Sequence, residues 1–205
     1  MSIVLYHHSH TRAGNVVWML EELGVPYTLH HLKLSAGEHK TPEMLALNPM
    51  GKLPVLVDGD VVVTESAAIG LYLADRYGNG TLAPTFDDPA RGPYLRWSLF
   101  SPSVIEPGSM AKAASWESPE ASVGWGNHSA MLDAMVSAIG DGPFLLGERF
   151  TMADVIFGGT IRFMLAFKML EAKPVFVDYV ARLNARPAAV AAKARNEAEL
   201  AANPA

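Results

Sequence analysis

The feature that most constrains the fold is an alternation of strand and helix patterns at the start of the chain. Residues 3–6 form a short apolar run, and residues 15–23 carry apolar side chains at helical spacing, followed by the stop signal of Gly24 and Pro26. Residues 27–32 then alternate as a strand does. These segments predict a strand, helix, strand unit.

The next segment adds a hairpin and two helices. A short helical pattern precedes the apolar runs 53–57 and 61–63, which flank the turn signal Asp58-Gly59-Asp60. A further helix is expected to begin near residues 65–66 and to end at Tyr77. The order βαβαββα predicts an α/β domain over the first 78 residues.

The composition changes after this domain. Residues 79–93 contain three prolines and two glycines, which is typical of a linker. Beyond them, apolar side chains recur at spacings of three and four, which predicts an all-helical domain over residues 94–205. Residues 188–202 have a weak apolar face, so either a last helix or a frayed end is expected there. The other expected helices cover residues 94–100, 127–139, 152–170 and 175–185.

Composition excludes several classes of function. The chain has no cysteine, which excludes disulfides, thiolate metal sites and catalysis by a thiol of the protein itself. Its seven histidines lack the spacing of a known metal site, so no metal is expected. Acidic residues exceed basic ones by 21 to 16, and the scattered basic residues argue against a nucleic-acid partner. No leader pattern or membrane-length apolar run is visible, so we expect a cytoplasmic protein that does not associate with membranes.

Two motifs carry chemical information. Residues 48–57 include Pro54 within an apolar strand pattern, where proline is tolerated if the backbone leaves the sheet or the preceding bond is cis. Residues 64–69 place Glu65 and Ser66 at a helix start, where amides and a hydroxyl suit a carboxylate and the acid suits an ammonium. Taken singly, the motifs have ordinary interpretations, an edge-strand proline and a helix cap. Taken together, they favour a ligand site.

The double motif resembles the glutathione-site signature of cytosolic glutathione S-transferases, with a theta-like active-site loop. The resemblance implies a thioredoxin-like domain, a following helical bundle domain, and glutathione as the co-substrate. It also implies a cis peptide bond before Pro54 and contacts from the Leu53 backbone to the cysteinyl part of glutathione. Glu65 and Ser66 would hold the γ-glutamyl group of glutathione. Lys52 would lie near the glycine carboxylate. The residues that we assign to glutathione binding are His10, Lys40, Lys52, Leu53, Pro54, Glu65 and Ser66.

A second match lies in the carboxy-terminal half. Residues 146–154 resemble the start of the buried helix in the second domain of the same family. Thr151 and Asp154 have the spacing of a capping box, in which each side chain satisfies the backbone amide of the other residue. We therefore predict a structural role for this pair.

The loop after the first strand should hold the group that activates the thiol. The thiol has a pKa of about 8.5, and the enzyme must lower this pKa by roughly two units to favour the thiolate. A hydroxyl donor and a helix amino terminus can supply this stabilisation. Relatives use tyrosine, serine or cysteine near this point. Counting back from Asn15, which takes the place of a frequent arginine, puts Thr11 at the serine position, and Ser9 is the alternative. Tyr6 is more typical of a packed strand residue.

The second substrate is expected in the helical domain. The sequence predicts a kink or mobile segment at residues 101–107, over a pocket for a small hydrophobic electrophile. Aromatic residues at helical spacing are also typical of a core. The candidates for this pocket are Tyr94, Trp97, Phe100, Met110 and Trp116.

Two hypotheses for function follow. In the first, the protein is a transferase that joins glutathione to an electrophile, or an enzyme that reduces an organic peroxide with glutathione. In the second, it is a carrier or regulatory protein that keeps the fold and the ligand site without turnover. The resemblance also implies a homodimer.

Overall fold

The computed structural model describes residues 3–203, which form two compact units. The first unit contains the residues up to Gly78 together with those from Arg186 on, and the second contains Asn79–Ala185. The sequence assigned residues 186–205 to the helical domain and residues 79–93 to a linker. The structure instead groups the last helix with the sheet, and the linker residues with the helices.

The first unit is built on a four-stranded mixed sheet of order β2-β1-β3-β4. β1 (Ile3–His7) pairs parallel with β2 (Tyr27–His31) and antiparallel with β3 (Val55–Asp58). β3 forms a hairpin with β4 (Val61–Thr64), and Gly59 in the turn adopts a left-handed φ of 62°. The predicted βαβαββα order is confirmed.

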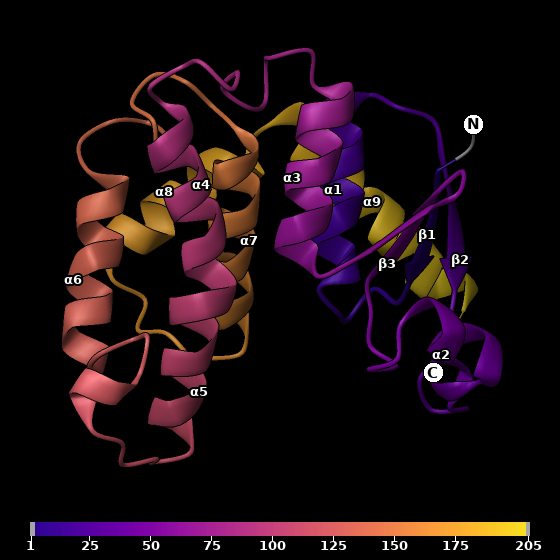
Figure 1. The fold of residues 1–205 in the computed structure, drawn as a ribbon, viewed down its shortest axis with the longest axis horizontal. Coiled ribbons are helices and arrows are strands. Elements are labelled where there is room, and N and C mark those ends of the chain that lie inside the picture. Colours follow the sequence, from indigo (N-terminus) through magenta and orange to yellow (C-terminus); the bar gives the residue numbers. More distant parts are fainter. Residues whose placement is uncertain (1–2, 204–205) are drawn as a thin grey trace. The chain divides into compact units, whose positions relative to one another are not determined.

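In the first unit, α1 (Ala13–Leu23) packs against both α3 (Ser66–Tyr77) and α9 (Pro187–Ala202) (Figure 1). α9 lies along α1, and its buried residues are the small Ala189 and Ala192. Small side chains let two helix backbones approach closely, so the weak apolar face of this stretch does not prevent packing. Of the two alternatives for residues 188–202, the helix is the one that forms.

α2 (Pro42–Leu47) follows the short η1 (Glu38–Lys40). The N-cap Thr41 accepts a hydrogen bond from the Met44 amide at 3.4 Å, which starts α2. Met44 is buried in a cluster with Leu32 and Val55, and Tyr6 of β1 packs against this cluster. Tyr6 is therefore a packed strand residue, as predicted.

In the second unit, one continuous helical stretch contains three prolines, Pro93, Pro102 and Pro107. α4 (Arg91–Phe100) leads through η2 (Ser101–Ile105), a turn of π-helix, into α5 (Glu106–Ala113). A π-helix accommodates an extra residue without ending the helix. The backbone remains helical across residues 101–107, and the irregularity that the sequence predicted there is a turn of π-helix.

The remaining helices of the second unit include one that is mostly buried. They are η3 (Glu120–Ser122), α6 (His128–Ile139), α7 (Met152–Ala166) and α8 (Pro174–Asn184). Most residues of α7 are buried, and its amino terminus carries the predicted capping box of Thr151 and Asp154. The structural role predicted for this pair is confirmed.

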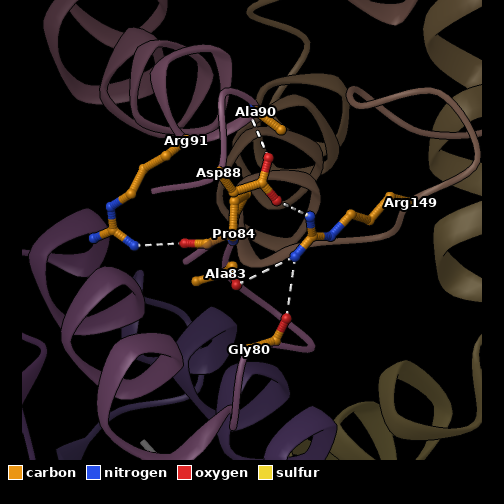
Figure 2. A network of polar contacts seen from close by, with 7 residues as sticks. All are labelled: Gly80, Ala83, Pro84, Asp88, Ala90, Arg91 and Arg149. Carbon is orange, nitrogen blue, oxygen red and sulfur yellow. Dashed lines mark hydrogen bonds and ion pairs between the residues drawn. The ribbon is translucent and has the colours of Figure 1, made fainter. Parts of the chain in front are cut away.

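Residues 79–93 are tied to the helical unit by two arginines (Figure 2). Arg149 donates from Nη1 to Asp88 Oδ2 at 2.6 Å, and from Nη2 to the Gly80 and Ala83 carbonyls. Arg91 donates to the Pro84 carbonyl at 2.7 Å. The guanidinium donors satisfy backbone carbonyls that a loose linker would expose to water.

Candidate glutathione site in the first unit

The register of the sheet brings three loops together at one end. Tyr6 pairs with Val55, and Val55 pairs with Thr64. The residues that follow β1, precede β3 and follow β4 are therefore neighbours in space. These are the three segments in which the sequence placed most of the candidate site residues.

Pro54 lies just before β3, and its bond to Leu53 is cis, as the resemblance implied. Because β3 begins at Val55, the proline stands outside the hydrogen-bonded ladder and removes no donor from it. The loop before it is ordered by the buried Asn48, whose Nδ2 donates to the Lys52 carbonyl at 2.9 Å. Sequence reasoning did not identify this role of Asn48.

The start of α3 has the geometry of an anion site. Glu65 is its N-cap and adopts φ 64° and ψ 119°, which is unusual for a residue with a side chain. No side chain caps this helix, so the ordinary interpretation of these residues as a helix cap does not hold. Ser66 begins the helix, whose first amides point toward the amino terminus. An exposed carboxylate and a turn of helix amides thus lie side by side.

Thr11 lies where β1 passes into α1. Its hydroxyl donates to the His8 carbonyl at 2.8 Å and accepts from the Ala13 amide at 3.1 Å. The hydrogen bond from the Ala13 amide orients the Thr11 side chain at the amino terminus of α1. A hydroxyl group that accepts a hydrogen bond also becomes a better hydrogen-bond donor.

Ser9 is held differently. Its hydroxyl donates at 2.9 Å to the backbone carbonyl of Asn196 in α9. Ser9 therefore connects the loop to a helix that lies 187 residues further along the chain.

The three basic candidates lie around the same loops. Lys40 Nζ donates to the Met50 carbonyl at 2.9 Å and lies close over Gly51. Lys52 is exposed beside it, and His10 is exposed on the β1–α1 loop. The structure therefore brings Lys40 and Lys52 together at the α2–β3 loop.

The five electrophile candidates do not form one cluster in the second unit. Tyr94 is fully buried, and Trp97 and Phe100 pack edge to face with their ring centroids 5.2 Å apart. Met110 is 48% exposed and lies thirteen residues beyond Trp97 on the same helical stretch, which corresponds to roughly 20 Å. Trp116 follows α5 and is 66% exposed. The structure thus spreads the five residues between the buried core and the exposed end of this stretch, and their role in binding an electrophile stays a prediction.

Sequence reasoning also missed the histidines beneath the β1–α1 loop. His7 is fully buried, and its Nε2 lies 2.7 Å from Asn196 Oδ1. Burial lowers the pKa of His7, although the bond to Asn196 partly opposes this shift. Burial also lowers the pKa of His31, its partner across the parallel ladder. The only sequence signal was a cluster of histidines, and no group of metal-ligating side chains occurs among residues 3–203.

Comparison with known proteins agrees with this geometry. The model of the glutathione S-transferase N-terminal domain matches residues 1–75, and that of the C-terminal domain matches residues 123–189. Human glutathione S-transferase theta-2B is 32% identical over 178 residues, covering 79% of this chain and 72% of the relative. The chain belongs to the glutathione S-transferase family.

Relatives in this family also match over nearly the whole length. Glutathione S-transferase F6 of Arabidopsis thaliana is 28% identical over 91% of this chain and 96% of its own. A glutathione transferase of Phanerochaete chrysosporium, solved in complex with oxidized glutathione, has a TM-score of 0.77 at 28% identity, covering 95% of this chain and 96% of its own. A glutathione transferase of Methylococcus capsulatus has a TM-score of 0.79 at 28% identity, covering 95% and 98%. Among the residues described, no helix of this family member could cross a membrane.

Proposed function

We propose that the protein catalyses attack of the glutathione thiolate on the electrophilic carbon of a small hydrophobic substrate. The thiol loses its proton to solvent, the sulfur forms a bond to carbon, and the leaving group departs with its bonding electrons. With an organic peroxide, the same thiolate would attack the outer oxygen, break the O–O bond and release the alcohol; the thiol of a second glutathione would then displace this oxygen as water and form the disulfide. Glutathione is the co-substrate in both reactions.

The observation that carries this proposal is the uncapped start of α3 beside the Leu53–Pro54 bond. The γ-glutamyl end of glutathione has a carboxylate and an ammonium. The first amides of α3 and the Ser66 hydroxyl suit the carboxylate, and the exposed Glu65 suits the ammonium. The cysteinyl part would then lie along Leu53, with Lys52, Lys40 and His10 toward the glycine carboxylate.

Thr11 is the better candidate for activating the thiol. Its hydroxyl now donates to a neutral carbonyl three residues back, and turning toward a thiolate would replace this bond with a stronger charge-assisted one. The bond from the Ala13 amide would be kept, because the hydroxyl accepts it. To reach the thiolate, the Ser9 hydroxyl would instead have to break its hydrogen bond to the Asn196 carbonyl of α9.

One observation favours the alternative, a binding protein without turnover. Both candidate hydroxyls donate their hydrogen to protein carbonyls in this structure. If neither turns toward the sulfur, glutathione would bind without becoming a thiolate.

The experiment that tests both functions combines calorimetric glutathione binding with turnover of a chromogenic aryl halide. In Thr11→Ala, kcat should fall about 10- to 100-fold, which corresponds to the loss of one hydrogen bond to a charged acceptor. Affinity for glutathione should be retained in that variant. In Ser66→Ala, affinity should fall while Thr11 remains in place.

Thr28→Ala is the matched control, because Thr28 is exposed on β2. Binding with no turnover of the halide or of an organic peroxide by wild type would support the binding protein. Absence of glutathione binding would overturn both functions. An unchanged kcat in Thr11→Ala, with a loss in Ser9→Ala, would assign the activation to Ser9.

The family resemblance supports two finer proposals. The protein acts as a cytoplasmic homodimer, and its second substrate is held by the helical unit, with Phe100 and Trp97 as candidate contacts. Sedimentation should give twice the chain mass of 22.1 kDa. A monomer at micromolar concentration would contradict the dimer.

A further inference from the structure

The side chain of Asn196 is fully used in joining α9 to the loop that carries Thr11. Nδ2 donates to the Gly14 carbonyl at 3.1 Å and to the Ala192 carbonyl in its own helix at 2.9 Å. Oδ1 lies 2.7 Å from Nε2 of the buried His7. A side-chain amide has two donors, and both are committed to carbonyl oxygens that cannot donate.

This arrangement fixes the tautomer of His7. Because both Asn196 hydrogens are used, only its oxygen faces the imidazole, so His7 must carry its proton on Nε2 and donate it. Burial favours the neutral form of the ring, because it lowers the pKa of His7. Asn196 thus holds the end of β1 through His7 and the first turn of α1 through Gly14.

The backbone of Asn196 adds a third connection, since its carbonyl accepts from Ser9 Oγ at 2.9 Å. The close approach depends on Gly14. A Cβ at this position would lie 3.0 Å from the Ser9 carbonyl oxygen and 3.4 Å from Asn196 Oδ1. The three attachment points, His7, Ser9 and Gly14, lie on both sides of Thr11 in the sequence.

We propose that Asn196 is a positioning residue for the thiol-activating loop, through which α9 sets the place of the Thr11 hydroxyl. The inference rests on the proposed function. A hydroxyl must lie about 3 Å from the sulfur to stabilise a thiolate, and a displacement of about 1 Å can cost up to 100-fold in rate. The loop is short, so the points on either side of Thr11 determine where that hydroxyl lies.

The test compares Asn196→Ala with Asn203→Ala. Asn203 ends the same helix, and its side chain donates only to the Glu199 carbonyl among the contacts described. In Asn196→Ala the bonds to His7 and Gly14 are lost, while the backbone bond to Ser9 is kept. We expect kcat with an aryl halide to fall about tenfold, with a KM for glutathione within about twofold of wild type.

The readout that separates positioning from stability is the pKa of the bound glutathione thiol, followed by the ultraviolet absorbance of the thiolate. It should rise by about one unit in Asn196→Ala, equivalent to the tenfold loss, and should not move in Asn203→Ala. Asn196→Asp preserves the volume and the acceptor for His7 but loses the donor to Gly14. It should also raise the thiol pKa, and it serves as the test if the alanine variant does not fold.

Each outcome decides the proposal. Suppose that wild type binds glutathione and catalyses turnover. If the pKa of the bound thiol is then the same in wild type, in Asn196→Asp and in any folded Asn196→Ala protein, Asn196 has no positioning role. A drop in thermal stability with an unchanged thiol pKa would likewise overturn the proposal. If wild type itself neither binds glutathione nor turns over, the proposed function fails instead.

Discussion

At the scale of the residue, the burial of His7 makes the stability of the protein depend on pH. Its ring is fully buried, and this burial lowers the pKa of His7, while Asn196 and Glu199 raise it and His31 and His8 lower it. The unfolded chain therefore binds a proton at a higher pH than the folded protein does. Stability should fall as the pH drops from about 6.5 toward the folded pKa, with a slope of at most about 1.4 kcal/mol per pH unit from this residue.

The prediction is checked by urea unfolding at several pH values between about 5 and 7.5. His7→Gln removes the titration and keeps an N–H group that can donate to Asn196 Oδ1. Its stability should fall less steeply below pH 6.5 than that of wild type. Equal slopes for the two proteins would show that His7 does not contribute to the acid side of the profile.

Asp154 is a buried carboxylate that organises the start of α7. It accepts from the amides of Leu145 and Thr151 and from the Tyr179 hydroxyl, at 2.8 to 2.9 Å. Burial raises the pKa of Asp154, and these bonds oppose the rise. Asp154→Ala would leave buried donors unsatisfied, at a cost of about 3–5 kcal/mol.

Chemical denaturation measures this cost, with Asp133→Ala on an exposed face of α6 as the control. The control should change the free energy of unfolding by less than about 0.5 kcal/mol. A loss below about 1 kcal/mol in Asp154→Ala would mean that water replaces the carboxylate at the buried amides.

At this scale the sequence was informative where chemistry is local. The capping box and the cis bond at Pro54 could be predicted, because each depends on neighbouring residues in the chain. The role of Asn196 could not, because its partners His7 and Gly14 lie more than 180 residues away. Only its spacing from Ala189 and Ala192, at helical intervals of seven and four, indicated that it shares their packed face.

At the scale of the element, α9 is held to α1 by an ion pair near its start. Arg186 donates from Nε and Nη2 to the two carboxylate oxygens of Glu22, at 2.7 and 2.8 Å. The Glu22 side chain is only 6% exposed and also accepts from Trp18 Nε1. A paired, nearly buried carboxylate is costly to leave without its cation.

Arg186→Ala should therefore lower the free energy of unfolding by about 2–3 kcal/mol, and Arg186→Lys should lose part of this because it cannot form the bidentate pair. Lys193→Ala is the control in the same helix, because its pair with Glu197 is exposed and 3.8 Å long. It should cost less than about 0.5 kcal/mol in the same urea experiment. Equal effects at the two positions would contradict the distinction between buried and exposed pairs.

The helix patterns also explain which elements the sequence predicted well. Apolar spacing predicted the helices near residues 94–100, 127–139 and 175–185, because each buries a wide apolar stripe. It did not predict η2, since Pro102 and Pro107 usually end a helix and only the tertiary setting favours the π-turn.

At the scale of the whole molecule, the chain forms a discontinuous unit and a continuous one. Local periodicity predicted the βαβαββα order and the all-helical part. It could not show that α9 returns to α1, because an Ala-rich helix carries no information about its distant partner. The first unit therefore takes its residues from both ends of the chain.

This arrangement predicts different behaviour for fragments. Residues 79–185 contain their own buried helix, capping box and arginine network, so they should fold alone into a helical, cooperatively melting protein. Residues 1–78 should not fold alone, because they lack α9 and, with it, the contacts of Asn196 and Arg186. Joining 1–78 to 186–205 through a flexible linker should restore a cooperative transition. Circular dichroism melts of the three fragments check this, and a stable fold of 1–78 alone would show that α9 is dispensable for the sheet.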